Sequence, residues 1–176
     1  MSIVFYSNNN VQTLVGSGLG VCFGQCTFYA KISKERDCVK TDASSIESNG
    51  TAAQALFLHY HSNYNQSRNS IFNLNGLTAG QRTDLAFTAQ TLAAALIAGN
   101  MGDTVFIDVH IPIIVNGAAQ IVEHVVAARL KDHGCLEYFD PNEGLFRESS
   151  DNDFSNAINA NFTKFNYSAF SYYPVT

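Results

Sequence analysis

The stretch that decides the fold is Glu123–Glu148, EHVVAARLKDHGCLEYFDPNEGLFRE. It holds three short runs rich in apolar and β-branched residues, at 123–130, 135–140 and 144–148. Asp132-His133-Gly134 separates the first two runs, and Pro141-Asn142-Glu143-Gly144 separates the last two. Both separators are turn sequences. Runs this short, joined by turns this short, predict neighbouring antiparallel strands.

Working outward from this stretch, the rest of the chain divides into a helical front and a strand-rich back. We expect further strands at Thr104–Ile111 and Phe165–Val175, and a short helix at Ala157–Phe162. We expect helices at Cys22–Ser33, Ala52–Asn63 and Asp84–Ala98, the last because apolar residues recur there at spacings of three and four. This order predicts an α+β fold in which an N-terminal helical part packs on a C-terminal antiparallel sheet. We expect residues 1–176 to form a single domain.

Composition excludes several classes of protein. Apolar residues make up 46% and charged residues 14% of the chain, which is typical of a globular protein. The formal net charge is −5, and no segment gathers Lys and Arg, so we expect no nucleic-acid binding. No apolar run approaches the roughly 18–20 residues of a membrane span, and the first ten residues do not resemble a Sec signal. We expect a monomer.

The four cysteines, Cys22, Cys26, Cys38 and Cys135, are expected to be reduced thiols, because a chain of this size needs no disulfide framework. Their spacing matches no zinc motif, and the sequence contains no phosphate-binding or dinucleotide-binding loop. We therefore expect no cofactor and no metal.

Cys22 is the first candidate nucleophile. It follows the glycine-rich segment 16–20 and begins a predicted helix, where unpaired backbone N–H groups stabilise a thiolate and hold a developing oxyanion. Cys26 lies one helical turn later and is the alternative nucleophile. Upstream of Cys22, Ser17 and Gln12 are the candidate side-chain donors to an oxyanion.

His124 and Asp140 complete the candidate constellation. Imidazole is the usual partner of a reactive thiol, since its pKa lies near neutrality. His124 lies in one predicted strand and Asp140 ends the next, so an antiparallel turn brings the two side chains together. An aspartate in that place can hold the second ring nitrogen of the histidine. His110, in another predicted strand, is the competing base.

Cys22, His124 in Glu-His-Val-Val-Ala-Ala, and Asp140 in Tyr-Phe-Asp-Pro-Asn-Glu-Gly-Leu-Phe together resemble the YopT/AvrPphB family of bacterial effector cysteine proteases. Gly20, Gly24 and Tyr29 also match, Tyr29 standing where that family has tryptophan. The resemblance implies a papain-like fold and a Cys22-His124-Asp140 triad. It also implies a virulence-associated thiol protease that is secreted without a Sec signal, delivered into the host cytoplasm, and cleaves a host protein.

A second resemblance covers Phe23–Ala30, FGQCTFYA, which is similar to the Gly-Gln-Cys-Thr-Trp-Tyr stretch of CHAP amidases. It implies a peptidoglycan amidase with Cys26 as its nucleophile. Two further alternatives stay open. The same triad serves transglutaminases and glutamine deamidases, and a papain-like domain can also be a catalytically inactive binding module.

Overall fold

The computed structural model of the chain describes residues 2–7, 21–59, 64–99, 101, 104–131 and 135–176. Within this part of the chain, one seven-stranded antiparallel sheet has the order β1-β6-β5-β4-β3-β7-β2. The strands are β1 (Ile3–Tyr6), β2 (Thr83–Phe87), β3 (Thr104–Val115), β4 (Ala118–Lys131), β5 (Cys135–Asp140), β6 (Gly144–Glu148) and β7 (Ser168–Pro174). The three strands predicted from 123–148 are the neighbours β4, β5 and β6, so this prediction is confirmed.

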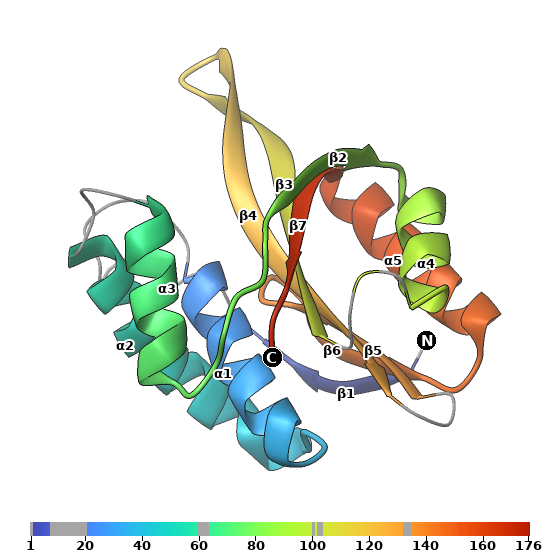
Figure 1. Cartoon of the computed structure of the whole chain (residues 1–176). Helices are drawn as coiled ribbons and strands as arrows, with labels where there is room; N and C mark the ends of the chain where they lie inside the picture. Colours follow the sequence, from blue (N-terminus) through green and yellow to red (C-terminus); the bar gives the residue numbers. More distant parts are fainter. Residues whose placement is uncertain (1, 8–20, 60–63, 100, 102–103, 132–134) are drawn as a thin grey trace.

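Helices cover both faces of the sheet (Figure 1). One face packs against α1 (Cys22–Glu35), α2 (Ala43–His59) and α3 (Tyr64–Leu74), and the other packs against α4 (Ala89–Ile97) and α5 (Asp151–Phe165). This architecture confirms the α+β fold with the Cys22 helix against the sheet, and it adds a helical layer on the second face. Because both faces are buried, β4 is apolar at consecutive positions: Val125 and Ala127 face α1, while Val126 and Ala128 face α4 and α5.

Two glycines let α1 and α2 cross at close range. A Cβ atom at Gly24 would lie 1.9 Å from the carbonyl oxygen of Gly50, and one at Gly50 would lie 2.7 Å from Cα of Gln25. Neither position has room for a larger residue. The close crossing also brings the side chain of Gln54, on α2, to the first turn of α1, where its Oε1 accepts the Gly24 N–H at 3.0 Å.

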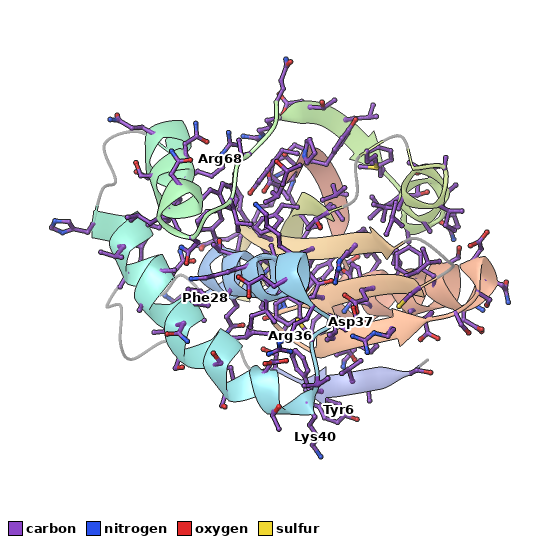
Figure 2. The ribbon with its side chains drawn as sticks, turned by 60° about the horizontal axis from the view of Figure 1, so that its bottom comes forward. Tyr6, Phe28, Arg36, Asp37, Lys40 and Arg68 are labelled. Atoms are coloured by element: carbon purple, nitrogen blue, oxygen red, sulfur yellow. The ribbon has the colours of Figure 1, made fainter. Side chains whose placement is uncertain are left out.

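The segment after α1 is braced by a bidentate ion pair. Nη1 and Nη2 of Arg36 lie 2.8 and 2.6 Å from the two carboxylate oxygens of Asp42, in the short 3₁₀ helix η1 (Lys40–Asp42). Figure 2 shows Arg36 at the end of α1 and Lys40 at the entry to η1. Among the helices that the structure describes, none is both long and apolar enough to cross a membrane.

The predicted helix at Asp84–Ala98 is wrong in its first turn. Residues 83–87 form β2, which pairs with β7, and α4 begins only at Ala89. Thr88 ends the strand and starts the helix, since its side chain accepts from the N–H of Thr91 while the Thr91 hydroxyl accepts from the N–H of Thr88. Three elements, β1, η1 and α3, were not predicted.

Four other elements, α2, α5, β3 and β4, extend well beyond their predicted bounds. α2 begins at Ala43, nine residues before the expected start; its expected end at 63 lies outside the described residues. α5 spans Asp151–Phe165, because Ser150 caps its start and Asn166 ends it in a left-handed conformation with φ 54°. β3 and β4 extend into one long hairpin through Asn116 and Gly117, whose φ angles of 51° and 79° suit a two-residue type I′ turn.

Candidate active site

Cys22 is the first residue of α1 and is partly exposed. Val21 precedes it without a side-chain cap to the helix, and Gln54 satisfies the N–H of Gly24, two residues into the helix. The backbone N–H groups of a first helical turn have no partner within the helix, and the helix dipole adds a partial positive charge there. Cys22 therefore lies where backbone N–H groups of α1 are free to hold a developing oxyanion.

His124 and Asp140 meet at the end of the pairing between β4 and β5. The pairing of β4 with β5 ends at Ala127 and Phe139, so at His124 β4 is paired only with β3, and β5 ends at Asp140. Nε2 of His124 lies 2.9 Å from Oδ1 of Asp140, and both side chains are buried. This is the contact that the spacing of 16 residues predicted.

Cys22 lies at the other side of the histidine. A side-chain hydrogen bond joins Cys22 to the His124 ring, whose Nε2 is engaged by Asp140. Burial alone would lower the pKa of His124. The negative charge of a Cys22 thiolate and the hydrogen bonds to Asp140 and Cys22 outweigh burial and raise this pKa to about 10. The buried ring therefore holds its proton more tightly than a free imidazole does.

Asp140 is held by four donors. Oδ1 accepts from His124 and from the backbone N–H of Asn142 at 2.8 Å. Oδ2 accepts from Nδ2 of Asn161 at 2.7 Å and from the hydroxyl of Tyr167 at 3.1 Å. Burial alone would raise the pKa of Asp140, but the hydrogen bond and charge of His124, with the bonds from Asn161 and Asn142, hold it below its usual range.

Asn161 and Tyr167 are site residues that sequence reasoning missed. Tyr167 also accepts a hydrogen bond at 2.7 Å from Asn142, and its ring centroid lies 5.5 Å from that of His124. The hydroxyl of Tyr138 donates to Asn161 Oδ1 at 2.7 Å, which fixes the amide so that its nitrogen points at Asp140. Neither Asn161 nor Tyr167 lies in a recognisable motif. Asn142 was in the quoted motif, but without a role.

Cys26, the alternative nucleophile, is fully buried. Its Sγ donates to the carbonyl of Val125 at 3.4 Å, and burial, together with the charges of Cys22, Asp140 and Asp108, raises the pKa of its thiol well above the usual value. A thiol in these surroundings is protonated and shielded from a substrate. The flanking Gln25 and Thr27 are also buried, and Thr27 bonds back to the carbonyl of Phe23 at 2.8 Å.

The competing base, His110, is engaged elsewhere. Its ring stacks on Phe170 with centroids 4.0 Å apart and an interplanar angle of 15°.

All four cysteines are unpaired thiols. Ser17 and Gln12, the expected oxyanion donors, lie outside the described residues. Among those that are described, no group of three His, Cys, Asp or Glu side chains is placed to hold a metal.

Tyr29 and Phe139 join the thiol helix to the strand that ends in Asp140. Their rings stack with centroids 5.0 Å apart, and the Tyr29 hydroxyl donates to the buried Glu137 at 2.9 Å. Arg147 neutralises Glu137 from β6 through Nε at 2.8 Å and Nη2 at 2.6 Å. These contacts fix α1 against β5 and so hold Cys22 in register with the His124–Asp140 pair.

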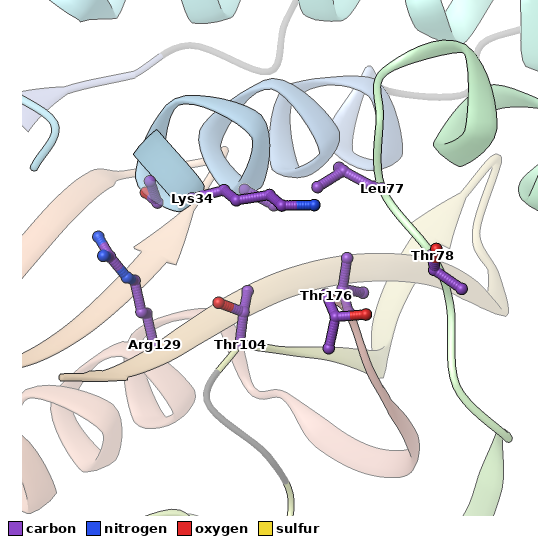
Figure 3. Close-up of a pocket in the computed structure, with 9 residues that line it drawn as sticks. Lys34, Leu77, Thr78, Thr104, Arg129 and Thr176 are labelled. Atoms are coloured by element: carbon purple, nitrogen blue, oxygen red, sulfur yellow. The ribbon is translucent and has the colours of Figure 1, made fainter. Parts of the chain in front are cut away.

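A pocket of about 370 Å³ lies at the opposite end of α1 from Cys22. Figure 3 shows Lys34 on the helix side of this pocket and Arg129, Thr104 and Thr176 on the sheet side. α1 has 14 residues, which corresponds to a length of about 20 Å. The pocket is therefore separate from the candidate active site.

Neither a protein family model nor a curated protein sequence matches this chain. Among solved structures, the crystal structure of the Pseudomonas avirulence protein AvrPphB is similar, with a TM-score of 0.59 and 13% sequence identity. The likeness covers 96% of this chain and 96% of that one. At this identity the likeness is one of fold. The chain thus has an AvrPphB-like fold, with Cys22, His124 and Asp140 gathered where α1 meets the open end of the β4–β5 pair.

Proposed function

We propose that the protein is a papain-like thiol protease, with Cys22 as nucleophile, His124 as base and Asp140 as the residue that orients it. The observation that carries the proposal is the unbroken contact from Cys22 through His124 to Asp140 at the start of a helix. A thiol next to a helix N-terminus and a carboxylate-held imidazole is the arrangement that activates a cysteine nucleophile.

In this mechanism the Cys22 thiolate attacks the carbonyl carbon of the scissile peptide bond, and the charge moves to the carbonyl oxygen. The backbone N–H groups at the start of α1 stabilise that oxyanion. The C–N bond then breaks as the imidazolium of His124 gives its proton to the leaving amine, which leaves a thioester on Cys22. His124 next takes a proton from water, the hydroxide adds to the thioester, and Cys22 leaves as the thiolate.

The host-directed part of the proposal rests on the fold. AvrPphB is described as an avirulence protein, and this chain shares its fold over nearly its whole length. We therefore propose a host protein as the substrate, and delivery into the host cytoplasm without a Sec signal. The peptidoglycan amidase alternative is disfavoured because the thiol that it requires, Cys26, is buried and bonded to Val125.

The first test is iodoacetamide labelling of the native protein near neutral pH, with the modified cysteine mapped by mass spectrometry. Cys26 is an internal control, since its thiol is buried. We expect rapid labelling of Cys22 in the wild type and much slower labelling in His124→Ala. Preferential labelling of Cys26 would instead favour the peptidoglycan amidase alternative. Slow labelling of all thiols, unaffected by the His124 change, would leave a papain-like binding module.

The second test separates hydrolysis from acyl transfer. The protein is incubated with extracts of candidate host cells, with and without added primary amines, and new protein termini are mapped by mass spectrometry. A protease generates termini that disappear in Cys22→Ser. Glutamine side chains converted to glutamate or to amine adducts, with no new termini, would instead show deamidase or transglutaminase activity.

A further inference from the structure

The β3–β4 hairpin extends well beyond its neighbours in the sheet. Pairing of β3 with β7 ends at His110, and pairing of β4 with β5 ends at Ala127, whereas β3 and β4 pair with each other as far as Val115 and Ala118. Figure 1 shows this end of the hairpin projecting past the helices, with β4 on the side of α1. Within the described part of the chain, residues 118–126 of β4 therefore have no strand at their outer edge.

The direction of the backbone groups at this edge follows from the turn. In a two-residue hairpin, the residues that flank the turn bond to each other, so Ala118 directs its N–H and C=O at β3. Because these directions alternate along a strand, Ala119, Ile121, Glu123 and Val125 direct theirs outward. The carbonyl of Val125 agrees with this assignment, since it accepts from Cys26 of α1. Among these outward residues, those before Val125 are therefore the ones that can receive a further strand.

This open edge begins at the candidate active site. Val125 follows His124 in β4, and Glu123 precedes it. Ala119, Ile121 and Glu123 are exposed, and Ile121 retains 67% of its surface. A long exposed edge of this kind is normally protected by lysine, proline or a bulge, and its outward positions here carry only one charge, that of Glu123.

We propose that an extended segment of the substrate polypeptide pairs with this edge of β4 and so adds a strand to the sheet beside Cys22. The inference rests on the proposed protease function and names how that protease holds its substrate. The substrate is favoured over other occupants because the edge runs directly from the residues that must meet the scissile bond. Strand addition uses main-chain hydrogen bonds, so the segment must be unfolded locally and free of proline at the paired positions.

The test compares Ile121→Pro with Ile121→Ala. Both variants lose the isoleucine side chain, but only proline removes the outward N–H, and proline is tolerated on a strand whose N–H faces solvent. The probes are two pools of iodoacetylated hexapeptides, rich in valine and threonine, with the reactive group at the N-terminal or the C-terminal end. For each variant, the rate of Cys22 alkylation by peptide is divided by its rate with iodoacetamide.

We expect at least one pool to react faster than iodoacetamide in the wild type, and the rate ratio to be about tenfold lower in Ile121→Pro than in Ile121→Ala. In wild-type protein carrying the peptide adduct, hydrogen exchange should slow at the outward amides of Ala119, Ile121 and Glu123. Gln120 and Val122, which face β3, should not change. This measurement decides the question even if the proline variant fails to fold.

Equal rate ratios in the two variants, or no slowing of exchange at the outward amides, would overturn the proposal. A wild-type dimer that dissociates in Ile121→Pro would assign the edge to a second copy of the chain instead. Failure of the protease proposal has a different signature, since labelling of Cys22 by iodoacetamide would then not depend on His124.

Discussion

Oδ1 of Asp140 lies 2.9 Å from Nε2 of His124, with both side chains buried, although 16 residues of sequence separate them. The contact holds the ring that also bonds to Cys22. It also sets the electrostatics of the site, because a buried carboxylate held by four donors stays ionised and favours a charged imidazole.

Replacing Asp140 with Asn should slow the alkylation of Cys22 near neutral pH on the order of 10²-fold or more, because the amide neither stabilises an imidazolium nor fixes its tautomer. The measurement is the rate of iodoacetamide labelling at Cys22. Asp151→Asn is the matched control, because it makes the same chemical change at an exposed position in the first turn of α5. Similar rates in the two variants would argue against an orienting role for Asp140.

The contribution of His124 to the free energy of unfolding should decrease as the pH rises. Its pKa is raised from 6.5 to about 10, so the folded state binds the proton more tightly than the unfolded state does. That stabilisation is complete below about pH 6.5 and is lost as the pH rises through about 10. Urea unfolding at pH 6, 8 and 10 should show the advantage of wild type over His124→Gln shrinking with pH. An advantage that grows with pH would mean that the buried ring is neutral.

Gly24→Ala should destabilise the protein by about 1–3 kcal/mol or more, since the added methyl group collides with the backbone of α2 at Gly50. Chemical denaturation of the variant against wild type measures the loss. Ser48→Ala, at an exposed position on the same helix α2, should stay within about 0.5 kcal/mol of wild type. If both variants have wild-type stability, the two helices do not cross as closely as described.

Gln54→Leu should cost about 1–3 kcal/mol, because the buried N–H of Gly24 loses its acceptor at the start of α1. Gln54→Glu keeps an acceptor oxygen and places a negative charge at a helix N-terminus, so it should cost less. Thermal unfolding of both variants checks the order. A leucine variant as stable as the glutamate variant would show that the side chain only fills space.

Arg147→Met should cost about 3–5 kcal/mol, because it leaves the buried carboxylate of Glu137 without its main counter-charge. Adding Glu137→Gln to this variant should recover part of the loss, since the unpaired charge is then removed. A double-mutant cycle from denaturant unfolding gives the coupling between the two residues. Additive losses would mean that the pair is not coupled in the folded protein.

The central strands and the contact of His124 with Asp140 were accessible from the sequence because their signals are local. Turn residues bound β5 and β6 on each side, and the pairing of β4 with β5 follows from two short runs and one short turn. The Asn116-Gly117 turn was an equally local signal for the full hairpin, as was Ser150 with the acidic first turn for α5. The full length of the hairpin and the start of α5 could therefore have been predicted from residue types alone.

The errors have a common physical origin. Residues 84–87 continue the helical pattern of α4, but β7 supplies a strand partner, and Thr88 supplies a cap that starts the helix later. α3 is polar in sequence, and only its packing through Ile71 and Phe72 against the core makes it a helix of this fold. A partner from elsewhere in the chain decided each case, as tertiary context commonly does with weak local preference.

By itself, the sequence determined the α+β order, the antiparallel pairing around 123–148, and the approach of His124 to Asp140, because turn residues and short runs of β-branched and apolar residues act over a few positions. Only the tertiary structure decided that Cys22 faces the histidine while Cys26 is buried against Val125, and that Asn161 and Tyr167 complete the surroundings of Asp140. These contacts join residues from separate elements. They exist only once α1 and α5 have packed on opposite faces of one sheet, a placement set by burial of apolar surface over the whole chain.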